Sequence, residues 1–192
     1  MAITTYMLGD TSTTHAGTGT LTATTTALSG AGGSAFLSEL TPGTVIIAAG
    51  QTLAITAAAS NSAATLQTAP TTPLAGAAFT IIPMYLVSAI GTDAVNPLGS
   101  YYAWTASKHL ANGLERSVGR PRALWLWKNI AATARTALKL YCPGKSARVY
   151  ICTLNDPSLG TYAAYQAAMI WPDSDNAYTP EFAIEHRDLI LL

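Results

Sequence analysis

The sequence predicts an all-β protein in two parts: a small N-terminal barrel or sandwich, followed by an antiparallel β-sandwich of jelly-roll type. Three observations predict it. Residues 1–92 consist mainly of Thr, Ala, Gly and Ser, in short runs separated by turn signals, which is typical of small barrels and sandwiches. All four Trp and seven of the nine Tyr lie in residues 101–192, which marks residues 93–100 as a linker. Beyond the linker, apolar and polar residues alternate with the period of a half-buried strand.

The N-terminal half is predicted as a run of short strands. Thr favours strands, and Gly, Pro and Asn mark the turns between them. A short helical turn or loop over residues 35–40 is expected to place Phe36 and Leu40 inward. The predicted strands cover residues 17–27, 44–48, 52–58, 64–68, 78–82 and 84–89, with turns at 29–34, 41–43, 50–51 and 61–62.

Residues 74–90 carry no charge, so a membrane-spanning helix has to be considered. The stretch is shorter than the roughly 20 apolar residues that a spanning helix needs, and Pro83 divides it. Two buried strands are therefore predicted, without membrane insertion. The N-terminal residues lack the cationic start and apolar run of a signal peptide.

The C-terminal half is predicted as an antiparallel sheet. Residues 124–127, Leu-Trp-Leu-Trp, are apolar on both faces, so they form a central strand or half of an interface. Residues 162–171 fit a helix by their alanines and a strand by their context, and the context favours the strand. The apolar end of residues 182–192 is expected to dock as a last strand, because exposed apolar runs are a liability.

A hairpin is predicted from residues 136–142 and 147–153, which alternate apolar and polar side chains around a Pro-Gly turn. In this hairpin Cys152 lies five residues beyond the position opposite Cys142. The two Cα atoms are then roughly 16 Å apart, whereas a disulfide needs about 7 Å or less. Both thiols are therefore expected to be free and buried.

Charge is scarce and unevenly distributed. Charged residues make up 10% of the chain, against about 25% in an ordinary soluble domain. Before Lys108 there is no Lys or Arg; residues 108–150 hold nine cations and one anion, and residues 151–192 hold six anions and one cation. So little charge predicts that other chains cover much of the surface. A net charge of zero gives no basis for nucleic-acid binding.

The basic and acidic segments allow two arrangements. In the first, the basic segment of one subunit meets the acidic segment of the next, head to tail. In the second, basic and acidic strands lie side by side within one sheet and pair inside the subunit. The sequence favours neither.

Residues 17–82 contain a series of short motifs rich in Gly, Thr and apolar residues. They read Gly17-Thr18-Gly19-Thr20-Leu21, Gly33-Ser34-Ala35-Phe36-Leu37-Ser38-Glu39-Leu40, Pro42-Gly43-Thr44-Val45-Ile46-Ile47, Gly50-Gln51-Thr52 and Ala75-Gly76-Ala77-Ala78-Phe79-Thr80-Ile81. The series resembles a domain that recurs in virion proteins of tailed bacteriophages, and departs from it at Ser34 and Thr44, where Thr and Asp are usual. The resemblance implies a non-enzymatic, oligomeric virion component, in the head or in the tail.

The residues offer little for catalysis or metal binding. His15, His109 and His186 lack the spacing of zinc ligands, and the acidic residues 173–176 lack the glycine and glutamate of a calcium loop. Residues 29–33 do not form a phosphate-binding motif, and no serine lies in a G-x-S-x-G elbow. The chain is therefore expected to be no enzyme and to need neither cofactor nor metal.

Aromatic, cationic and terminal apolar residues of the second half are interpreted as a subunit contact, because Trp, Tyr and Arg are enriched in protein interfaces. The expected contact residues are Arg120, Arg122, Trp125, Trp127, Tyr141, Tyr150, Leu191 and Leu192. The alternative is a carbohydrate-binding module for host recognition, in which Trp104 or Trp171 stacks on sugar rings.

A structural protein of the virion is the function that these observations favour. The first choice is a capsid decoration (cement) protein on the head surface, which clamps neighbouring major capsid subunits through many weak contacts. A tail, neck or fibre-attachment component is the alternative within the virion. The expected partners are the major capsid protein or other virion proteins, together with copies of the chain itself, a trimer being favoured. Neither nucleic acid nor a membrane is expected as a partner.

Overall fold

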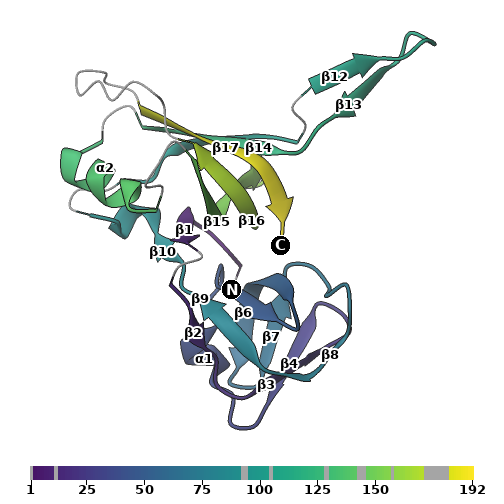
Figure 1. Cartoon of the computed structure of the whole chain (residues 1–192), viewed down its shortest axis with the longest axis vertical. Coiled ribbons are helices and arrows are strands. Elements are labelled where there is room, and N and C mark those ends of the chain that lie inside the picture. Colours follow the sequence, from purple (N-terminus) through teal and green to yellow (C-terminus); the bar gives the residue numbers. More distant parts are fainter. Residues whose placement is uncertain are drawn as a thin grey trace.

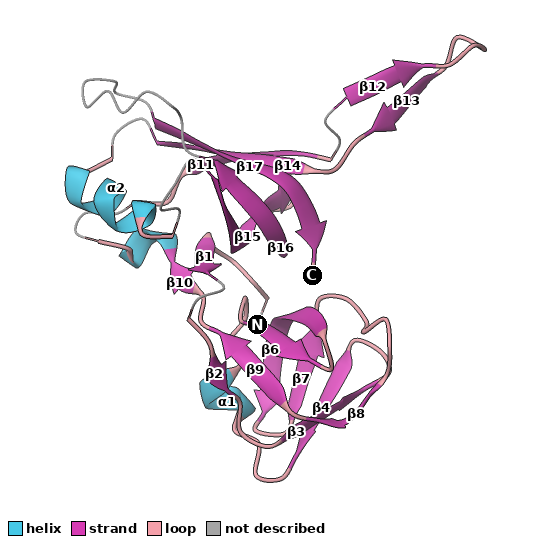
Figure 2. Ribbon diagram, viewed as in Figure 1, coloured by secondary structure: helices cyan, strands magenta, loops and turns pink. Residues whose placement is uncertain are grey.

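The computed structural model describes residues 2–10, 13–91, 95–103, 106–127, 130–141, 146–156, 158–170 and 182–192. Antiparallel strands form an eight-stranded sheet from the first half, a seven-stranded sheet mainly from the second half, and a two-stranded arm. Figure 2 shows the two sheets as separate bodies, one above the other, with the arm projecting from the upper one. The predicted all-β class is confirmed, and the described strands close no barrel.

The eight-stranded sheet has the order β2-β9-β5-β6-β7-β4-β3-β8. Strand β6 belongs to both of its parts, because its first residues pair with β5 and its last with β7, where two register shifts bend it. The sheet therefore folds over and encloses a core that includes Leu21, Ile46, Ile55 and Phe79. Its strands are β2 (His15–Ala16), β3 (Thr20–Ala23), β4 (Ala27–Ala31), β5 (Val45–Ala48), β6 (Gln51–Ser60), β7 (Ala63–Leu66), β8 (Leu74–Ala77) and β9 (Phe79–Ile82).

Local turn signals account for much of this unit. The strands predicted over 44–48, 52–58 and 64–68 are found as β5, β6 and β7. The predicted helical turn is α1 (Phe36–Glu39), and Phe36 and the following Leu40 are fully buried. For these four elements, the structure confirms what residue type and spacing predicted.

Two predictions in this half need correction. The strand predicted over residues 17–27 is broken by a bend at 24–26 and forms β3 and β4 instead. Beyond Pro83 a strand to residue 89 was expected, but β10 (Tyr85–Leu86) is short and a 3-10 turn, η1 (Val87–Ala89), follows it. Along the described residues, no helix is long and apolar enough to cross a bilayer.

The seven-stranded sheet has the order β10-β1-β15-β16-β17-β14-β11. It curls, so that Tyr101 on the edge strand β11 reaches Tyr165 on β16, with the ring centroids 6.0 Å apart. The enclosed core contains Trp125, Trp127 and Met169. Besides β10, its strands are β1 (Met7–Asp10), β11 (Leu98–Tyr102), β14 (Arg122–Trp127), β15 (Ser146–Asp156), β16 (Thr161–Ile170) and β17 (Phe182–Leu191).

The sheet shows which structure residues 162–171 adopt and where the predicted last strand docks. Residues 162–171 follow their context, since Thr161–Ile170 form a strand. The expected last strand is β17, and it lies inside the sheet between β16 and β14. The backbone thus places a strand of the acidic segment beside one of the basic segment within a single chain, as in the side-by-side arrangement.

The predicted hairpin over 136–142 and 147–153 is wrong. Ala132–Lys139 form a helix, α2, and β15 pairs with β1 and β16 instead. The segment is rich in Ala, the best helix former. Its apolar residues Ala134 and Leu138 are four apart, so they share one helix face, and both are buried.

The two halves meet along a defined seam. Gln67, just after β7, donates from Nε2 to the carbonyl oxygens of Ala164 (2.8 Å) and Leu192 (2.6 Å), and its Oε1 accepts from the Ala164 N–H at 2.7 Å. Apolar residues from both halves, among them Val45 and Cys152, form a third core cluster there. The seam joins the two bodies in one molecule.

The division between the halves is less simple than a cut near residue 92. The first strand, β1, pairs with β15 and β10, so an N-terminal segment belongs to the sheet of the second half. Residues 92–94, within the expected boundary region, lie outside the described residues. The unit that the first half builds by itself runs from β2 to β9.

The arm lies between β11 and β14 in the chain, and its two strands pair in a register that matches theirs. Tyr102 pairs with Arg122 in the sheet. Continued without a slip, the same ladder would pair Ala106 with Val118, and this is the pair found in the arm. The arm strands are β12 (Ala106–His109) and β13 (Glu115–Val118). The arm is a separate two-stranded sheet between β11 and β14, and it projects from the body as Figure 1 shows.

Candidate functional site

The arm, residues 106–118, is the most exposed feature of the described chain. Its tip is a three-residue turn in which Gly113 has φ +80°, a left-handed conformation suited to glycine. The N–H of Leu110 donates to the carbonyl oxygen of Leu114 at 2.8 Å, which closes the turn. The side-chain oxygen of Asn112 accepts from the Leu114 N–H at 3.1 Å. Such turns are common in hairpins, so the sequence itself builds a firm tip.

The two faces of the arm differ in chemistry. Residues directly opposite each other in a hairpin share a face, and successive residues alternate. Lys108 is opposite Arg116, and the tip residues Leu110 and Leu114 follow on the same side; we call these four the cation–leucine face. The other face carries the pair His109 and Glu115, whose Nε2 and Oε1 atoms lie 3.4 Å apart.

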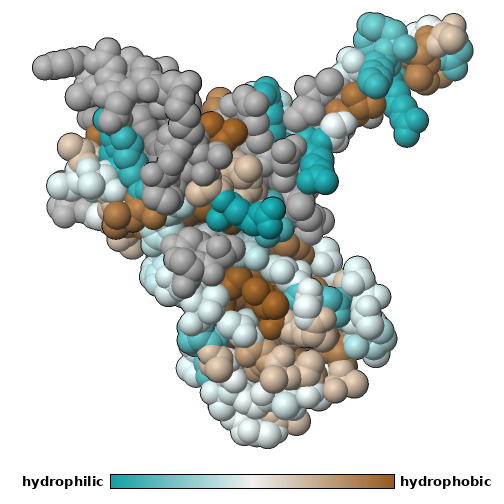
Figure 3. All heavy atoms as spheres, viewed as in Figure 1, coloured by the Kyte–Doolittle hydropathy of each residue, from teal (hydrophilic) through white to brown (hydrophobic). Residues whose placement is uncertain are grey.

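The cation–leucine face is not covered by the chain's own body. Leu110 is 42% and Leu114 61% exposed, and Lys108 and Arg116 are exposed as well. In Figure 3, hydrophilic and hydrophobic residues lie side by side on the arm, while the visible face of the N-terminal unit is mostly pale. Two like charges facing each other across a hairpin are destabilising, and among the described residues neither has an ion pair.

The arm also lacks the support that a hairpin usually needs. Within the described chain, β12 and β13 pair with each other and with no third strand. A two-stranded hairpin without further packing is marginally stable in water. A sheet edge with unpaired backbone groups is also a template for another chain. Among the described residues, the edges of both arm strands are therefore open to solvent.

The structure corrects half of the predicted contact residues. Trp125 is fully buried and Trp127 nearly so, both in the core of the second half. Each indole N–H has a partner inside the chain: Trp125 donates to the Thr153 hydroxyl at 2.9 Å, and Trp127 to the Val95 carbonyl oxygen at 2.8 Å. Satisfied indoles are stable in a core, so these rings are not available to a partner subunit or a sugar.

Tyr150 and Leu192 are also buried, in the seam between the halves. Tyr141 is partly buried and lies near Tyr85, with ring centroids 6.0 Å apart. Leu191 is the last residue of β17, and its side chain lies outside the described part of the structure. Leu192, the last residue, is thus packed against the chain itself.

Two of the predicted contact residues lie at the base of the arm. Arg120 is exposed between β13 and β14. Arg122 begins β14, and its guanidinium carbon lies 4.9 Å from the centroid of the Tyr102 ring, a cation–π contact. Their role as contact residues remains a prediction, and the sequence analysis did not predict the arm next to them.

The signal for the arm is present in the sequence. Asn112-Gly113 is a strong hairpin turn, and the residues before and after it alternate in character. Gly119 and Pro121, which both weaken a strand, separate the arm from residues 122–127.

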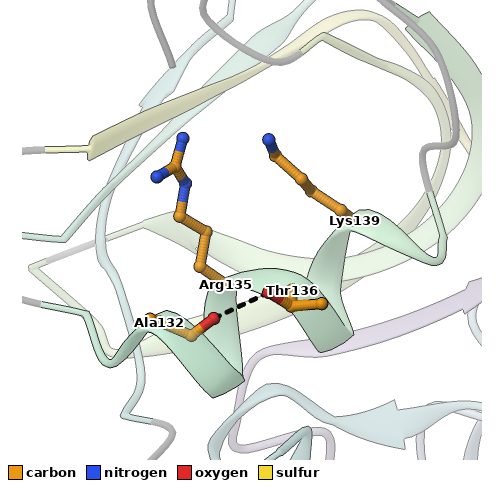
Figure 4. A pocket seen from close by; sticks show the side chains of 4 residues that line it. All are labelled: Ala132, Arg135, Thr136 and Lys139. Carbon is orange, nitrogen blue, oxygen red and sulfur yellow. Dashed lines mark hydrogen bonds between the residues drawn. The ribbon is translucent and has the colours of Figure 1, made fainter. Parts of the chain in front are cut away.

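A small hollow of about 130 Å³ lies beside α2, lined by Ala132, Arg135, Thr136 and Lys139. Arg135 and Lys139 extend side by side from one side of the helix, as Figure 4 shows. The Thr136 hydroxyl donates to the Ala132 carbonyl oxygen at 2.9 Å, so it is occupied within the helix. Arg135 and Lys139 both have further interactions within the chain. The lining of the hollow therefore contains two cationic side chains and no carboxylate, thiol or imidazole.

The Gly- and Thr-rich motifs within residues 17–82 have a structural role in the N-terminal unit. The Thr18 N–H donates to Glu39 Oε2 at 3.0 Å, and the Thr18 hydroxyl binds Oε1 of the same carboxylate. The N–H of Gly17 donates to the Phe79 carbonyl oxygen at 3.0 Å. A Cβ at Gly17 would overlap the Phe79 ring. The motif residues thus hold one end of the eight-stranded sheet together.

The described chain offers neither a metal-binding cluster nor a reactive thiol. Over the described residues, no group of three or more His, Cys, Asp or Glu is arranged to hold a metal ion. Cys152 is free, as predicted, and its burial raises the pKa of the thiol to about 12. Cys142, Trp104, Trp171 and the acidic residues 173–176 lie outside the described residues.

Comparisons of the chain with protein-family models, with curated proteins and with solved structures gave no match.

Proposed function

We propose that this chain is a non-enzymatic structural protein of a tailed-phage virion, and within the virion a capsid decoration protein. The observation that carries the proposal is the uncovered arm, whose cation–leucine face projects from an otherwise charge-poor molecule. A projecting hairpin of this kind suits contact with a neighbouring protein better than contact with a small molecule, because it offers open strand edges and no enclosed pocket among the described residues.

Two further features support the proposal. Charged residues make up 10% of the chain, whereas a free surface is usually kept dispersed by more charge than this. The motifs of residues 17–82 resemble a domain of phage virion proteins, and the residues that carry them build the end of a compact β unit. A small rigid unit with an arm is a suitable shape for a protein that is repeated many times on a lattice.

The proposed mechanism is mechanical. Each copy would bury weakly polar surface on the lattice and engage a neighbour through its arm. Individual contacts of this kind are weak, but contacts linked on one particle act at high effective concentration and add up to a stable shell.

The test is to locate the protein in purified particles of the phage that encodes it, with antibody labelling and separate analysis of DNA-filled heads and isolated tails. Labelling of heads, together with faster heat inactivation of particles that lack the protein, is the result expected for a decoration protein. Labelling of tails alone would replace the decoration role by a tail component. Absence from both fractions would overturn the virion proposal.

A further inference from the structure

We infer that Asn112, at the tip of the arm, is a site of spontaneous deamidation, and that the product loosens the turn that closes the arm. The inference goes beyond the proposed function, because the reaction needs only water and takes place in the isolated chain, whether or not the chain is a virion protein.

The residue that follows Asn112 makes it the most reactive asparagine of the sequence. Asparagine is thermolabile, and its deamidation begins when the backbone nitrogen of the next residue attacks the side-chain carbonyl carbon. Asn112 is the only asparagine that precedes a glycine, which lacks a side chain to hinder this attack. Asn96 is the opposite case, because the nitrogen of Pro97 carries no hydrogen and cannot attack.

The closed turn at the tip holds both reacting groups. The Gly113 N–H donates to the Leu110 carbonyl oxygen at 2.9 Å, and the side-chain oxygen of Asn112 accepts from the Leu114 N–H at 3.1 Å. Both Asn112 and Gly113 are exposed. Attack therefore requires the turn to open, and the rate depends on how often it does.

Opening of the tip requires little free energy. Among the described residues, β12 and β13 pair with each other and with no third strand, and a two-stranded hairpin is marginally stable. Lys108 and Arg116, opposite each other in the ladder, add a repulsion between like charges. Loop tips of this kind open at free energies near zero, whereas strands inside a sheet open at much higher cost.

Two other described asparagines are held more firmly. Asn155 lies in β15, which pairs with β16, and its side-chain oxygen accepts from the Tyr165 hydroxyl at 2.8 Å. Asn61 accepts from two N–H groups of α1: its carbonyl oxygen from Phe36 at 3.2 Å and its side-chain oxygen from Leu37 at 3.3 Å. Neither precedes a glycine, so both serve as internal references.

The reaction is balanced with water as the only reagent. The Gly113 nitrogen forms a bond to Cγ of Asn112, the bond from Cγ to Nδ2 breaks, and ammonia leaves with the proton given up by the Gly113 nitrogen. Water then opens the five-membered succinimide at one of its two bonds to that nitrogen. Cleavage at Cγ gives an aspartate, and cleavage at the backbone carbonyl carbon gives an isoaspartate, in which the main chain runs through the former side chain.

The isoaspartate changes the turn, because it lengthens the main chain by a carbon atom between residues 112 and 113. The turn is closed by two backbone bonds, from the Leu110 N–H to the Leu114 carbonyl oxygen and from the Gly113 N–H to the Leu110 carbonyl oxygen. Loop length and turn type are coupled in hairpins, so a longer main chain cannot keep both bonds. The arm should therefore lose its closed tip as the protein ages.

The experiment follows the purified full-length chain during incubation at mildly alkaline pH. Trypsin cleaves after Lys108 and Arg116, so residues 109–116 appear as one peptide, and mass spectrometry measures its conversion against the unincubated sample. Asn112 is expected to react about tenfold or more faster than Asn61 and Asn155, in line with their costs of opening. Equal rates at the three sites, or an intact Asn112 after either reference has reacted, would overturn the inference.

Lys108→Glu tests whether opening of the arm controls the rate. The substitution replaces a repulsion with Arg116 by an attraction, so the arm should open less often and Asn112 should react about two- to fivefold more slowly. Lys139→Glu is the matched control, because it changes the net charge equally but lies on α2, and it should leave the rate unchanged. An equal rate in wild type and Lys108→Glu, or an equal slowing by Lys139→Glu, would contradict control by the arm.

A second readout tests the product. The isoaspartate form is isolated from aged protein and compared with Asn112→Asp, which has the same charge and a normal main chain. Hydrogen exchange of the Leu110 and Gly113 amides, followed by NMR, should be faster in the isoaspartate form, because their acceptors are lost. Equal exchange in the two proteins would show that the isoaspartate does not loosen the turn.

Discussion

Leu138 and Leu140 are two residues apart, and helix α2 puts them in opposite environments. Leu138 is 1% exposed within the core of the second half, whereas Leu140 is 76% exposed. In a strand both side chains would lie on the same face, and this was the basis of the predicted hairpin. The loss of stability on truncating each of the two leucines therefore distinguishes the helix from the predicted strand.

We expect Leu138→Ala to lower the free energy of unfolding by about 2–5 kcal/mol, the usual range for a truncated core leucine. Leu140→Ala should stay within about 0.5 kcal/mol of wild type, as exposed substitutions do. Urea unfolding followed by tryptophan fluorescence measures both. Equal losses for the two variants would contradict the helix.

The free energy of unfolding should fall in alkaline solution because two buried groups, the Cys152 thiol and the Tyr6 hydroxyl, hold their protons more tightly in the folded chain. Burial raises the pKa of Cys152 from 9.0 to about 12, and that of Tyr6 from 10.0 to about 12. Below about pH 8, a unit under the ordinary thiol pKa of 9.0, both groups keep their protons in the folded and the unfolded chain. Above it the unfolded chain releases protons that the folded chain retains, so the free energy of unfolding declines with rising pH. Burial also raises the pKa of Tyr165, which acts in the same direction.

The measurement is urea unfolding at intervals between pH 7.5 and about pH 10.5. Cys152→Ala is the control: its packing loss lowers stability at every pH, but the decline above pH 9 should be shallower because one of the linked protons is gone. A free energy of unfolding that stays constant across this range would rule out the buried, protonated thiol.

At the scale of elements, the sequence predicted those that are defined by their own turns. The chain around Phe36 and Leu40 follows local glycine and proline signals, and it folds as expected. A strand was wrongly predicted over residues 136–142 because Leu138 and Leu140 lie two residues apart, as residues on one face of a strand do. The four-residue spacing from Ala134 to Leu138, both buried, is the one that packs. Short segments can satisfy both periods, and tertiary contacts decide between them.

The candidate site was only partly predictable for a similar reason. Trp is common in interfaces and equally suited to a core, so residue type alone could not show that Trp125 is buried; Arg120 is exposed, as charged side chains usually are. The distinction depends on which strand lies opposite and on which face. That information comes from pairings far apart in the sequence.

Gly17→Ala tests the role of the motif as an element of structure. The added methyl group would overlap the ring of Phe79, a core residue, and overpacking of this kind costs about 1–3 kcal/mol. We expect a lower thermal midpoint for Gly17→Ala and no change for Ala16→Ser, which adds one atom at the neighbouring exposed position. A Gly17→Ala protein as stable as wild type would show that the motif glycine is not required for packing.

At the scale of the whole molecule, Gln67 joins the halves. Its amide makes three hydrogen bonds across the seam, to the backbone of Ala164 and Leu192. Ala164 is fully buried, so its backbone groups would lose partners that water cannot easily replace. Each buried polar group left without a partner costs about 1–3 kcal/mol.

Gln51 provides the matched comparison. Its amide also makes three hydrogen bonds, to Thr71 and Thr72, but these lie in an exposed loop of the first half. Gln67→Ala should therefore lower the thermal midpoint clearly more than Gln51→Ala, and calorimetry should show a less cooperative transition as the halves uncouple. Equal midpoints for the two variants would mean that the seam contributes little to stability.

Strand β1 has a consequence for the order of events during synthesis. Met7 pairs with Cys152, so the ribosome releases β1 long before its main partner exists. Strands β2 to β9 have all their partners within residues 15–82 and can fold early, but the second sheet cannot be completed until β15, β16 and β17 have emerged. Pairings so distant in the sequence are slow to form. During that interval the apolar edge of β1 is open to other nascent chains, and on polysomes this strand is where misassembly would begin.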